Sequence, residues 1–224
     1  MNDLNHIAFI MDGNGRWGLK KKNSRNYGHL AGVKTVQKIV EASSLLKVPI
    51  ITFYVFSTEN WKRPKKEINY LFNLINIYFN KEIDNIIKNN IKIVISGRLK
   101  KLPPKISKIL KKAAVKTRKN NKLIINLAIN YGAKAEVIDA IKKINFISKR
   151  VTEDNIDKNL YSNLSFPDIL VRTGGQKRLS NFMLWQLAYT EIFFLDKLWP
   201  DFTKNDLKKI IKKYHKIKRN FGGI

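Results

Sequence analysis

The sequence predicts an α/β fold, with a single domain over residues 1–224 in which helices flank a mainly parallel central sheet. Short apolar runs alternate with amphipathic segments along the whole chain, as in proteins built from strand–helix–strand units. The 224 residues, of which 44% are hydrophobic, suffice for one sizeable core. Polar and basic residues follow the apolar runs, and ligands of parallel sheets bind at those strand ends.

The individual elements follow from the hydrophobic pattern. Strands are expected in the apolar runs at 6–11, 50–56, 91–96, 122–130 and 168–172. The run at 50–56 is continuously apolar, as expected of a strand buried on both faces. Helices are expected over 29–47, over 65–88, after Pro103 and Pro104, and from Ala133 to about Ser148. A final helix is expected to open at Thr203, a good N-cap residue.

The composition restricts the cellular setting. Cysteine is absent, which excludes disulfides and thiolate zinc sites and predicts a cytoplasmic location. The N-terminus has no basic run before its first apolar segment, and the apolar stretch 48–56 is too short to cross a bilayer. Secretion and membrane spanning are therefore not expected.

The charge is strongly basic, with 44 Lys and Arg against 17 Asp and Glu, a formal net charge of +27. Such a charge suits nucleic acid or an anionic membrane. The lysines are scattered along the chain, which favours solvated faces over a nucleic-acid-binding stripe, so no nucleic acid partner is expected. Peripheral contact with anionic lipid at the inner face of the membrane is expected. A basic nucleic-acid-binding protein is the alternative.

The stretch FIMDGNGRWG (9–18) matches the G-x-G-x-x-G spacing of a dinucleotide-binding loop. Such a loop runs directly into a helix and is followed about 20 residues later by an acidic residue that binds ribose. Here Gly18 precedes a polar, basic segment, and a helix is expected only near His29. The first acidic residue beyond the loop is Glu41, inside that helix. Both features argue against a dinucleotide site.

The same loop suits a different phosphate ligand. Gly13 and Gly15 allow backbone N–H groups to approach phosphate oxygens, and Arg16 and Arg25 can supply forked donors. Asp12 can hold a hydrated magnesium ion shared with a diphosphate. The alternative for an isolated Asp-Gly is that the aspartate only caps a turn.

Two further strand ends carry phosphate-type donors. In FSTENWKRP (56–64) they are Ser57, Asn60 and Arg63, next to the aromatic Trp61. In RTGGQKRLSN (172–181) they are Arg172, Arg178 and Ser180, around a glycine pair. Three strand ends with such donors predict two anionic groups bound side by side.

These motifs resemble those of the cis-prenyltransferases, the family of the undecaprenyl diphosphate synthases. The segments that carry the resemblance, in the family's order, are HIAFIMDGNGRW, GHLAGV, TFYVFSTENWKRP, NLAINYG, DILVRTGGQKRLSNFMLWQLAYTEIFF and LWPDF. The resemblance runs from His6 to the terminal NFGG. No Asp-Asp pair occurs, whereas trans-prenyltransferases ionise their substrates through aspartate-rich motifs.

The resemblance implies a transferase that repeatedly condenses isopentenyl diphosphate, in cis, onto an allylic diphosphate such as farnesyl diphosphate. The implied product is undecaprenyl diphosphate, the lipid carrier precursor of cell-wall synthesis. It also implies a homodimer and a hydrophobic product tunnel. The helix from Ile68 to Ile83 either forms a wall of that tunnel or simply packs within the core. A catalytically silent subunit of a prenyltransferase complex is a further alternative.

The resemblance also implies residue roles. Magnesium (Mg²⁺) would be bound by Asp12 and Glu191, and the catalytic residues would be Asp12 and Asn60. An amide is too weak a base to act alone, so positioning is the role expected of Asn60. The substrate-binding residues would be Gly13, Asn14, Gly15, Arg16, Trp17, Arg25 and His29 for the allylic diphosphate, Ser57, Thr58, Glu59, Trp61 and Arg63 at the reaction centre, and Arg172, Arg178, Leu179 and Ser180 for isopentenyl diphosphate.

The chain departs from the family pattern at three places. The usual Gly-Asp after the third strand is Gly97-Arg98, which reverses a charge. The usual Glu-His after the glycine pair is Gln176-Lys177, which removes a possible metal ligand. Where the family usually has Arg-Phe-Gly near the C-terminus, this chain has Asn220 in place of the arginine, and Arg219 stands one position earlier.

Overall fold

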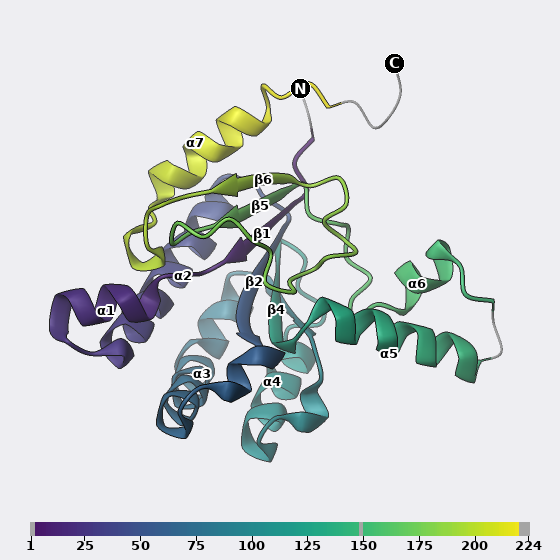
Figure 1. The fold of residues 1–224 in the computed structure, drawn as a ribbon, viewed down its shortest axis with the longest axis horizontal. Helices are drawn as coiled ribbons and strands as arrows, with labels where there is room; N and C mark the ends of the chain where they lie inside the picture. Colours follow the sequence, from purple (N-terminus) through teal and green to yellow (C-terminus); the bar gives the residue numbers. More distant parts are fainter. Residues whose placement is uncertain (1–2, 148–149, 220–224) are drawn as a thin grey trace. The chain divides into compact units, whose positions relative to one another are not determined.

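A computed structural model describes residues 3–147 and 150–219 (Figure 1). The terminal Asn220 and the residues after it lie outside the described residues. The chain divides into two compact units. The first contains Met1–Ile51, Phe166–Arg178 and Gln186–Ile224, and the second contains Thr52–Ser165 and Leu179–Trp185. That residues 1–224 form a single domain stays a prediction.

Six strands form a sheet in the order β3-β4-β2-β1-β5-β6. Their bounds are β1 His6–Ile10, β2 Ile50–Ser57, β3 Ile91–Ser96, β4 Leu123–Tyr131, β5 Ile169–Arg172 and β6 Glu191–Phe194. The pairs β1–β5, β3–β4 and β5–β6 are all parallel. The α/β class with a mainly parallel sheet flanked by helices is therefore confirmed. Strand β2 begins in the first unit and ends in the second.

In the first unit, helices α1 (Asn14–Lys22), α2 (Arg25–Leu45) and α7 (Lys204–Tyr214) accompany β1, β5 and β6 (Figure 1). Every residue of β1 is buried. Trp199, buried in the short 3₁₀ helix η3 (Trp199–Asp201), packs its ring on Phe9 and donates from Nε1 to the carbonyl of Gly32 at 3.0 Å. The expected N-cap of α7 is confirmed, since the Thr203 hydroxyl accepts from the backbone N–H of Asp206.

The prediction that a helix resumes only near His29 is wrong. Helix α1 starts at Asn14, directly after Gly13, and α2 starts at Arg25. The buried residues of α1 are both glycines, so the helix has no apolar periodicity by which the sequence could reveal it. These glycines allow close packing, because a Cβ on Gly18 would lie 2.2 Å from the carbonyl oxygen of Ser24. The case against a dinucleotide site then rests on the missing acidic residue.

In the second unit, helices α3 (Lys65–Lys88), α4 (Pro104–Lys116), α5 (Ala133–Phe146) and α6 (Glu153–Asn159) accompany β3 and β4. Helix α3 has the bounds that its pattern predicts and buries Ile68, Phe72 and Phe79 on one face. Strand β6 and helix α6 were not predicted from the sequence. Within residues 3–147 and 150–219, no helix is both long and apolar enough to cross a membrane.

Candidate active site

The central feature of the first unit is the carboxylate of Asp12, just beyond the end of β1. Arg16 donates from Nη2 to Oδ1 at 3.2 Å, and Arg172 donates from Nη2 to Oδ2 at 3.0 Å. Arg172 is the last residue of β5 and pairs in register with Ile10, so the sheet itself brings it to Asp12. The predicted residues Asp12, Arg16 and Arg172 thus meet at the carboxyl ends of β1 and β5.

The backbone around Asp12 is held by hydrogen bonds within the same unit. Thr173 donates from Oγ1 to the Asp12 carbonyl at 2.8 Å, and the Trp199 backbone N–H donates to that carbonyl at 3.0 Å. Arg16 also donates to the carbonyl of Gly174 at 2.8 Å. Gly174 has a φ of +90°, and a Cβ there would lie 2.6 Å from Arg16 Nη2. Glycine at 174 therefore provides the space in which Arg16 reaches Asp12.

The N-terminus of α1 has no side-chain cap. Its N-cap, Gly13, has a φ of 108° and supplies no side-chain hydrogen bond, and the first turn contains no acidic residue. A Cβ on Gly15 would lie 2.7 Å from Cζ of Arg25, so the Arg25 guanidinium lies directly over this turn. Backbone amides and an arginine at a helix N-terminus form the arrangement that binds phosphate groups. Gly13, Asn14, Gly15 and Arg25 are thus grouped as the sequence predicts.

Two predicted substrate-binding residues on these helices are engaged in packing. The Trp17 ring stacks on Tyr27 with ring centroids 5.6 Å apart, and its Nε1 donates to Asp201 Oδ1 at 2.8 Å. His29 is buried in α2 with 7% of its surface exposed.

Arg178 lies in the loop after β5. Its carbonyl accepts a hydrogen bond from Arg172 Nη1, and its own Nη1 donates to Gln176 Oε1. Gln176 stands where the family usually has glutamate, and it contacts Arg178 as a neutral acceptor. The Arg178 side chain is exposed, as expected of a group that meets a ligand from solvent.

Glu191, the second predicted magnesium ligand, lies at the opposite end of the strands from Asp12. It opens β6 and pairs in register with Ile169, whereas Arg172 pairs with Phe194. Three residue steps separate these ends by about 10 Å along the strand. The Glu191 carboxylate instead lies 3.6 Å from Nε of Arg219. Within one chain the structure does not bring Glu191 to Asp12, and the described ranges contain no cluster of three or more His, Cys, Asp or Glu that could hold a metal ion.

In the second unit, Ser57 and Asn60 form a capping box at the start of the 3₁₀ helix η1 (Thr58–Lys62). Asn60 Oδ1 accepts from the Ser57 backbone N–H at 3.2 Å, and the Ser57 hydroxyl accepts from the Asn60 backbone N–H. The carbonyl of the Asn60 amide is therefore used to hold the turn. This geometry favours a positioning role for Asn60 over one as a base.

Glu59 is tied to the loop that contains Leu179 and Ser180. Asn181 donates from Nδ2 to Glu59 Oε1 at 2.8 Å, and Tyr54 donates from its hydroxyl to the Ser180 carbonyl at 3.3 Å. Burial raises the pKa of Glu59, but hydrogen bonds from Asn181, its own backbone N–H, Ser57 and Thr58 together bring that pKa below its ordinary value. Glu59 is thus held as a carboxylate.

Trp61 is the aromatic centre of this turn. Its ring lies 5.2 Å from Phe56 and 5.6 Å from Phe72, measured between ring centroids. Its Nε1 donates to Asn130 Oδ1 at 2.7 Å. Trp61 is 39% exposed, so one part of the cluster remains accessible. Arg63, next along, donates to the buried Glu67 at 3.3 Å.

Sequence reasoning missed Thr173 and Asn181 and did not recognise the role of Asn130. Asn130 and Asn181 both have positive φ, at 49° and 61°, a conformation that asparagine tolerates better than most residues. An asparagine at the end of the apolar run 122–130 is the signal that could have identified Asn130.

The fold and the site define a class of protein, an α/β protein with arginines and a carboxylate at the ends of its strands. Comparison with known proteins agrees with this class. The family model described as "Putative undecaprenyl diphosphate synthase" matches residues 10–222. An isoprenyl transferase of Fusobacterium nucleatum subsp. nucleatum is 43% identical, with 98% of this chain and 96% of the relative covered. One from Halalkalibacterium halodurans is 44% identical, with 98% and 89% covered.

Two solved structures are also similar. A probable undecaprenyl diphosphate synthase from Campylobacter jejuni has a TM-score of 0.87 and 37% identity, with 99% of this chain and 100% of the other covered. Lavandulyl diphosphate synthase from Lavandula x intermedia, in complex with dimethylallyl diphosphate, has a TM-score of 0.92 and 29% identity, with 97% and 98% covered. The chain belongs to the undecaprenyl diphosphate synthase family of isoprenyl transferases.

Proposed function

We propose that the chain is a cytoplasmic, magnesium-dependent cis-prenyltransferase that elongates an allylic diphosphate, farnesyl diphosphate, with isopentenyl diphosphate to undecaprenyl diphosphate. The observation that carries the proposal is the cluster of Asp12, Arg16 and Arg172 at the ends of β1 and β5, beside the N-terminus of α1, which has no side-chain cap. This cluster offers forked cationic donors and backbone amides, the groups that recognise diphosphates. Family membership supports the same reaction class.

The proposed chemistry uses these groups at defined steps. The allylic C–O bond breaks and its electron pair leaves with the pyrophosphate, while the double bond of isopentenyl diphosphate forms the new C–C bond. A proton is then lost to the released pyrophosphate. Arg16 and Arg25 stabilise the charge that develops on the leaving group, and Arg172 holds the diphosphate of isopentenyl diphosphate. The aromatic cluster of Phe56, Trp61 and Phe72 suits an allylic cation, because ring faces attract cations and exclude water.

The residues present fit one magnesium ion shared with a substrate. Magnesium is commonly held by one or two carboxylates together with phosphate oxygens and water. Asp12 provides one carboxylate, 28% exposed at its side chain, between two arginines that also suit the phosphates. Bound there, magnesium would neutralise charge on the departing diphosphate.

A homodimer is proposed through the edge strand β6. Its Ile192 and Phe194 are 38% and 36% exposed, and the nearby Tyr189 is 68% exposed. An apolar edge strand left open to water favours association with another chain. Because Glu191 starts this strand, away from Asp12 of its own chain, the proposed interface would also include Glu191.

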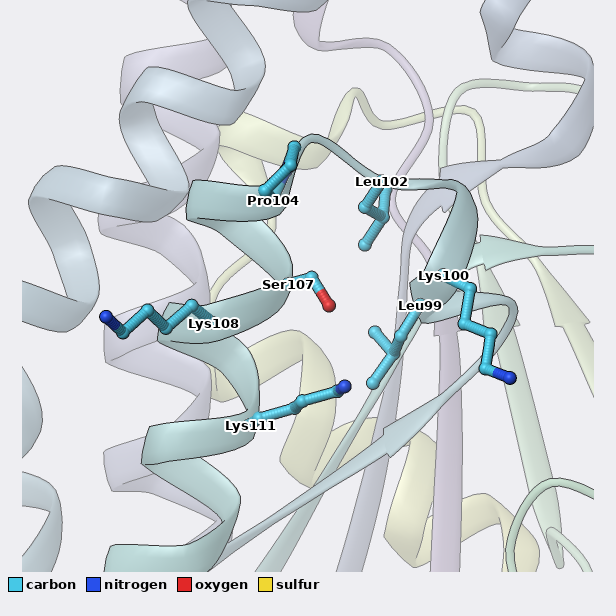
Figure 2. Close-up of a pocket in the computed structure, with 7 residues that line it drawn as sticks. All are labelled: Leu99, Lys100, Leu102, Pro104, Ser107, Lys108 and Lys111. Carbon is cyan, nitrogen blue, oxygen red and sulfur yellow. The ribbon is translucent and has the colours of Figure 1, made fainter.

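Peripheral contact with anionic lipid is proposed for the hollow beside α4. The hollow has a volume of about 450 Å³ and is lined by Leu99, Lys100, Leu102, Pro104, Ser107, Lys108 and Lys111 (Figure 2). Among the described residues, no hydrogen bond or ion pair involves the side chains of Lys100, Lys108 or Lys111. Lysines around an apolar floor suit a phosphate headgroup and its first methylenes. Flotation with phosphatidylglycerol vesicles, but not with phosphatidylcholine vesicles, is the expected result.

The test of the enzyme is incorporation of radiolabelled isopentenyl diphosphate into organic-extractable product, with farnesyl diphosphate as primer. We expect product with magnesium and none with excess chelator, with an undecaprenyl chain length by chromatography. No incorporation from folded protein, with shorter and longer primers also tried, would favour the silent subunit. A salt-sensitive gel shift that no diphosphate competes would favour the nucleic-acid-binding alternative.

A further inference from the structure

Arg98, where the chain carries the reversed charge, has a defined partner in the second unit. Its Nε donates to Oδ2 of Asp139 and its Nη2 donates to Oδ1, both at 2.8 Å. This is the bidentate geometry in which arginine binds carboxylate best. Asp139 lies on α5, and Tyr161 donates its hydroxyl to Asp139 Oδ2 at 2.5 Å. The ion pair therefore joins the turn after β3 to α5.

The backbone of Arg98 is held as firmly as its side chain. Its N–H donates to the Asn130 carbonyl at 3.2 Å, and Asn130 Nδ2 donates to the Arg98 carbonyl at 2.9 Å. Gly97 has a φ of +135°, and a Cβ there would lie 2.0 Å from the Ile129 carbonyl oxygen. The turn thus lies directly against the end of β4, where only glycine fits at 97.

Asn130 connects this turn to Trp61. Its Nδ2 donates to the backbone carbonyl of Arg98, and its Oδ1 accepts from Trp61 Nε1 at 2.7 Å. Asn130 is 2% exposed and has a φ of 49°, so its amide has little freedom to turn. The orientation of the Trp61 ring, packed on Phe56 and Phe72, therefore depends on a buried amide whose other end is held by Arg98.

We propose that Arg98 and Asp139 are positioning residues that orient Trp61, through Asn130, at the reaction centre. The inference rests on the proposed function, in which Trp61 lines that centre, and adds two residues outside the set of predicted site residues. The Arg98 guanidinium holds the pKa of the Asp139 carboxyl below its ordinary value, so the pair stays charged near neutral pH. The carboxylate of Asp139 also supplies a negative charge opposite Arg98, which stands where the family usually has an aspartate.

The test uses Asp139→Asn, which keeps the shape of the side chain and removes its charge. Each of the protein's four tryptophans contributes one indole N–H signal to a ¹H–¹⁵N spectrum, and the signal of Trp61 is to be assigned by its loss in Trp61→Phe. We expect the Trp61 signal to move and those of the other tryptophans to stay. We also expect kcat to fall about tenfold with KM within about twofold, because orientation is lost and binding is retained.

A second variant and a matched control make the result specific. Arg98→Lys keeps the charge but loses the forked donor, so it should move the Trp61 signal in the same direction. Asp154→Asn breaks the exposed 2.6 Å pair with Lys158 in the same unit and should move neither the Trp61 signal nor kcat.

A Trp61 signal that stays in place in folded Asp139→Asn and Arg98→Lys overturns the inference. So does a moved signal with unchanged kcat. Inactivity of the unmodified protein would count against the proposed function instead, while the spectra still decide whether Arg98 orients Trp61.

Discussion

Arg172 and Asp12 are 160 positions apart in the chain, yet Nη2 of the arginine lies 3.0 Å from Oδ2 of the aspartate. The Arg172 side chain is 4% exposed and that of Asp12 is 28% exposed. A guanidinium this buried requires a counter-charge. Asp12 therefore has a structural role, as the partner of Arg172, in addition to its proposed role at the diphosphate.

Asp12→Asn should lower turnover by about 10²-fold or more, because the charge proposed to hold magnesium at the diphosphate is lost. It should also lower the free energy of unfolding by about 2 kcal/mol, since Arg172 loses its carboxylate. Steady-state incorporation and urea unfolding measure the two effects. The control is Glu41→Gln, on an exposed position of α2, which should change neither. Near-normal turnover in folded Asp12→Asn would contradict the assignment.

Gly174→Ala should be more damaging than Gly175→Ala. Both glycines have positive φ, +90° and +74°, so alanine at either position costs about 1 kcal/mol of unfolding free energy in backbone strain. A Cβ at 174 would additionally lie 2.6 Å from Arg16 Nη2, whereas at 175 its nearest contact is at 3.4 Å. We expect turnover to fall about tenfold or more only in Gly174→Ala. Equal losses in the two variants would show that crowding at Asp12 has no effect.

The Arg98–Asp139 pair should make the free energy of unfolding depend on pH under acidic conditions. The guanidinium of Arg98 lowers the pKa of Asp139 in the folded protein below its unfolded value of about 4. The pair is therefore fully stabilising above about pH 4 to 5, and its contribution is lost as the pH falls through the folded pKa. The difference in unfolding free energy between unmodified protein and Asp139→Asn, about 2 kcal/mol near neutral pH, should shrink below about pH 4. A difference that grows on acidification would contradict this sign.

Ile192→Lys should convert the proposed homodimer into a monomer, because it places a charge on the open apolar face of β6. Light scattering coupled to size-exclusion chromatography measures the mass directly. Ile138→Lys, at a position of α5 that is 50% exposed, is the control and should leave the mass unchanged. A single-chain mass for the unmodified protein would refute the proposed dimer at once.

Much of the fold can be predicted from the sequence because it is encoded locally. Continuous apolar runs predict β1 to β5, and helical spacing predicts α3 with its bounds. The residues after those strands also predict that Asp12, Arg16 and Arg172 lie at one edge of the sheet. Helix α1 could not be predicted in this way, since its buried residues are glycines, which carry no hydrophobic signal.

By itself, the sequence determined the α/β class, the donors at the strand ends and the family to which they belong. Only the tertiary structure decided that Glu191 lies at the end of β6 that is far from Asp12. It also decided that the side-chain carbonyl of Asn60 holds a turn and that Asp139 forms an ion pair with Arg98. Periodicity comes from neighbours in the chain, whereas the partner of a charged or amide group depends on which distant strands and helices pack together and in what register.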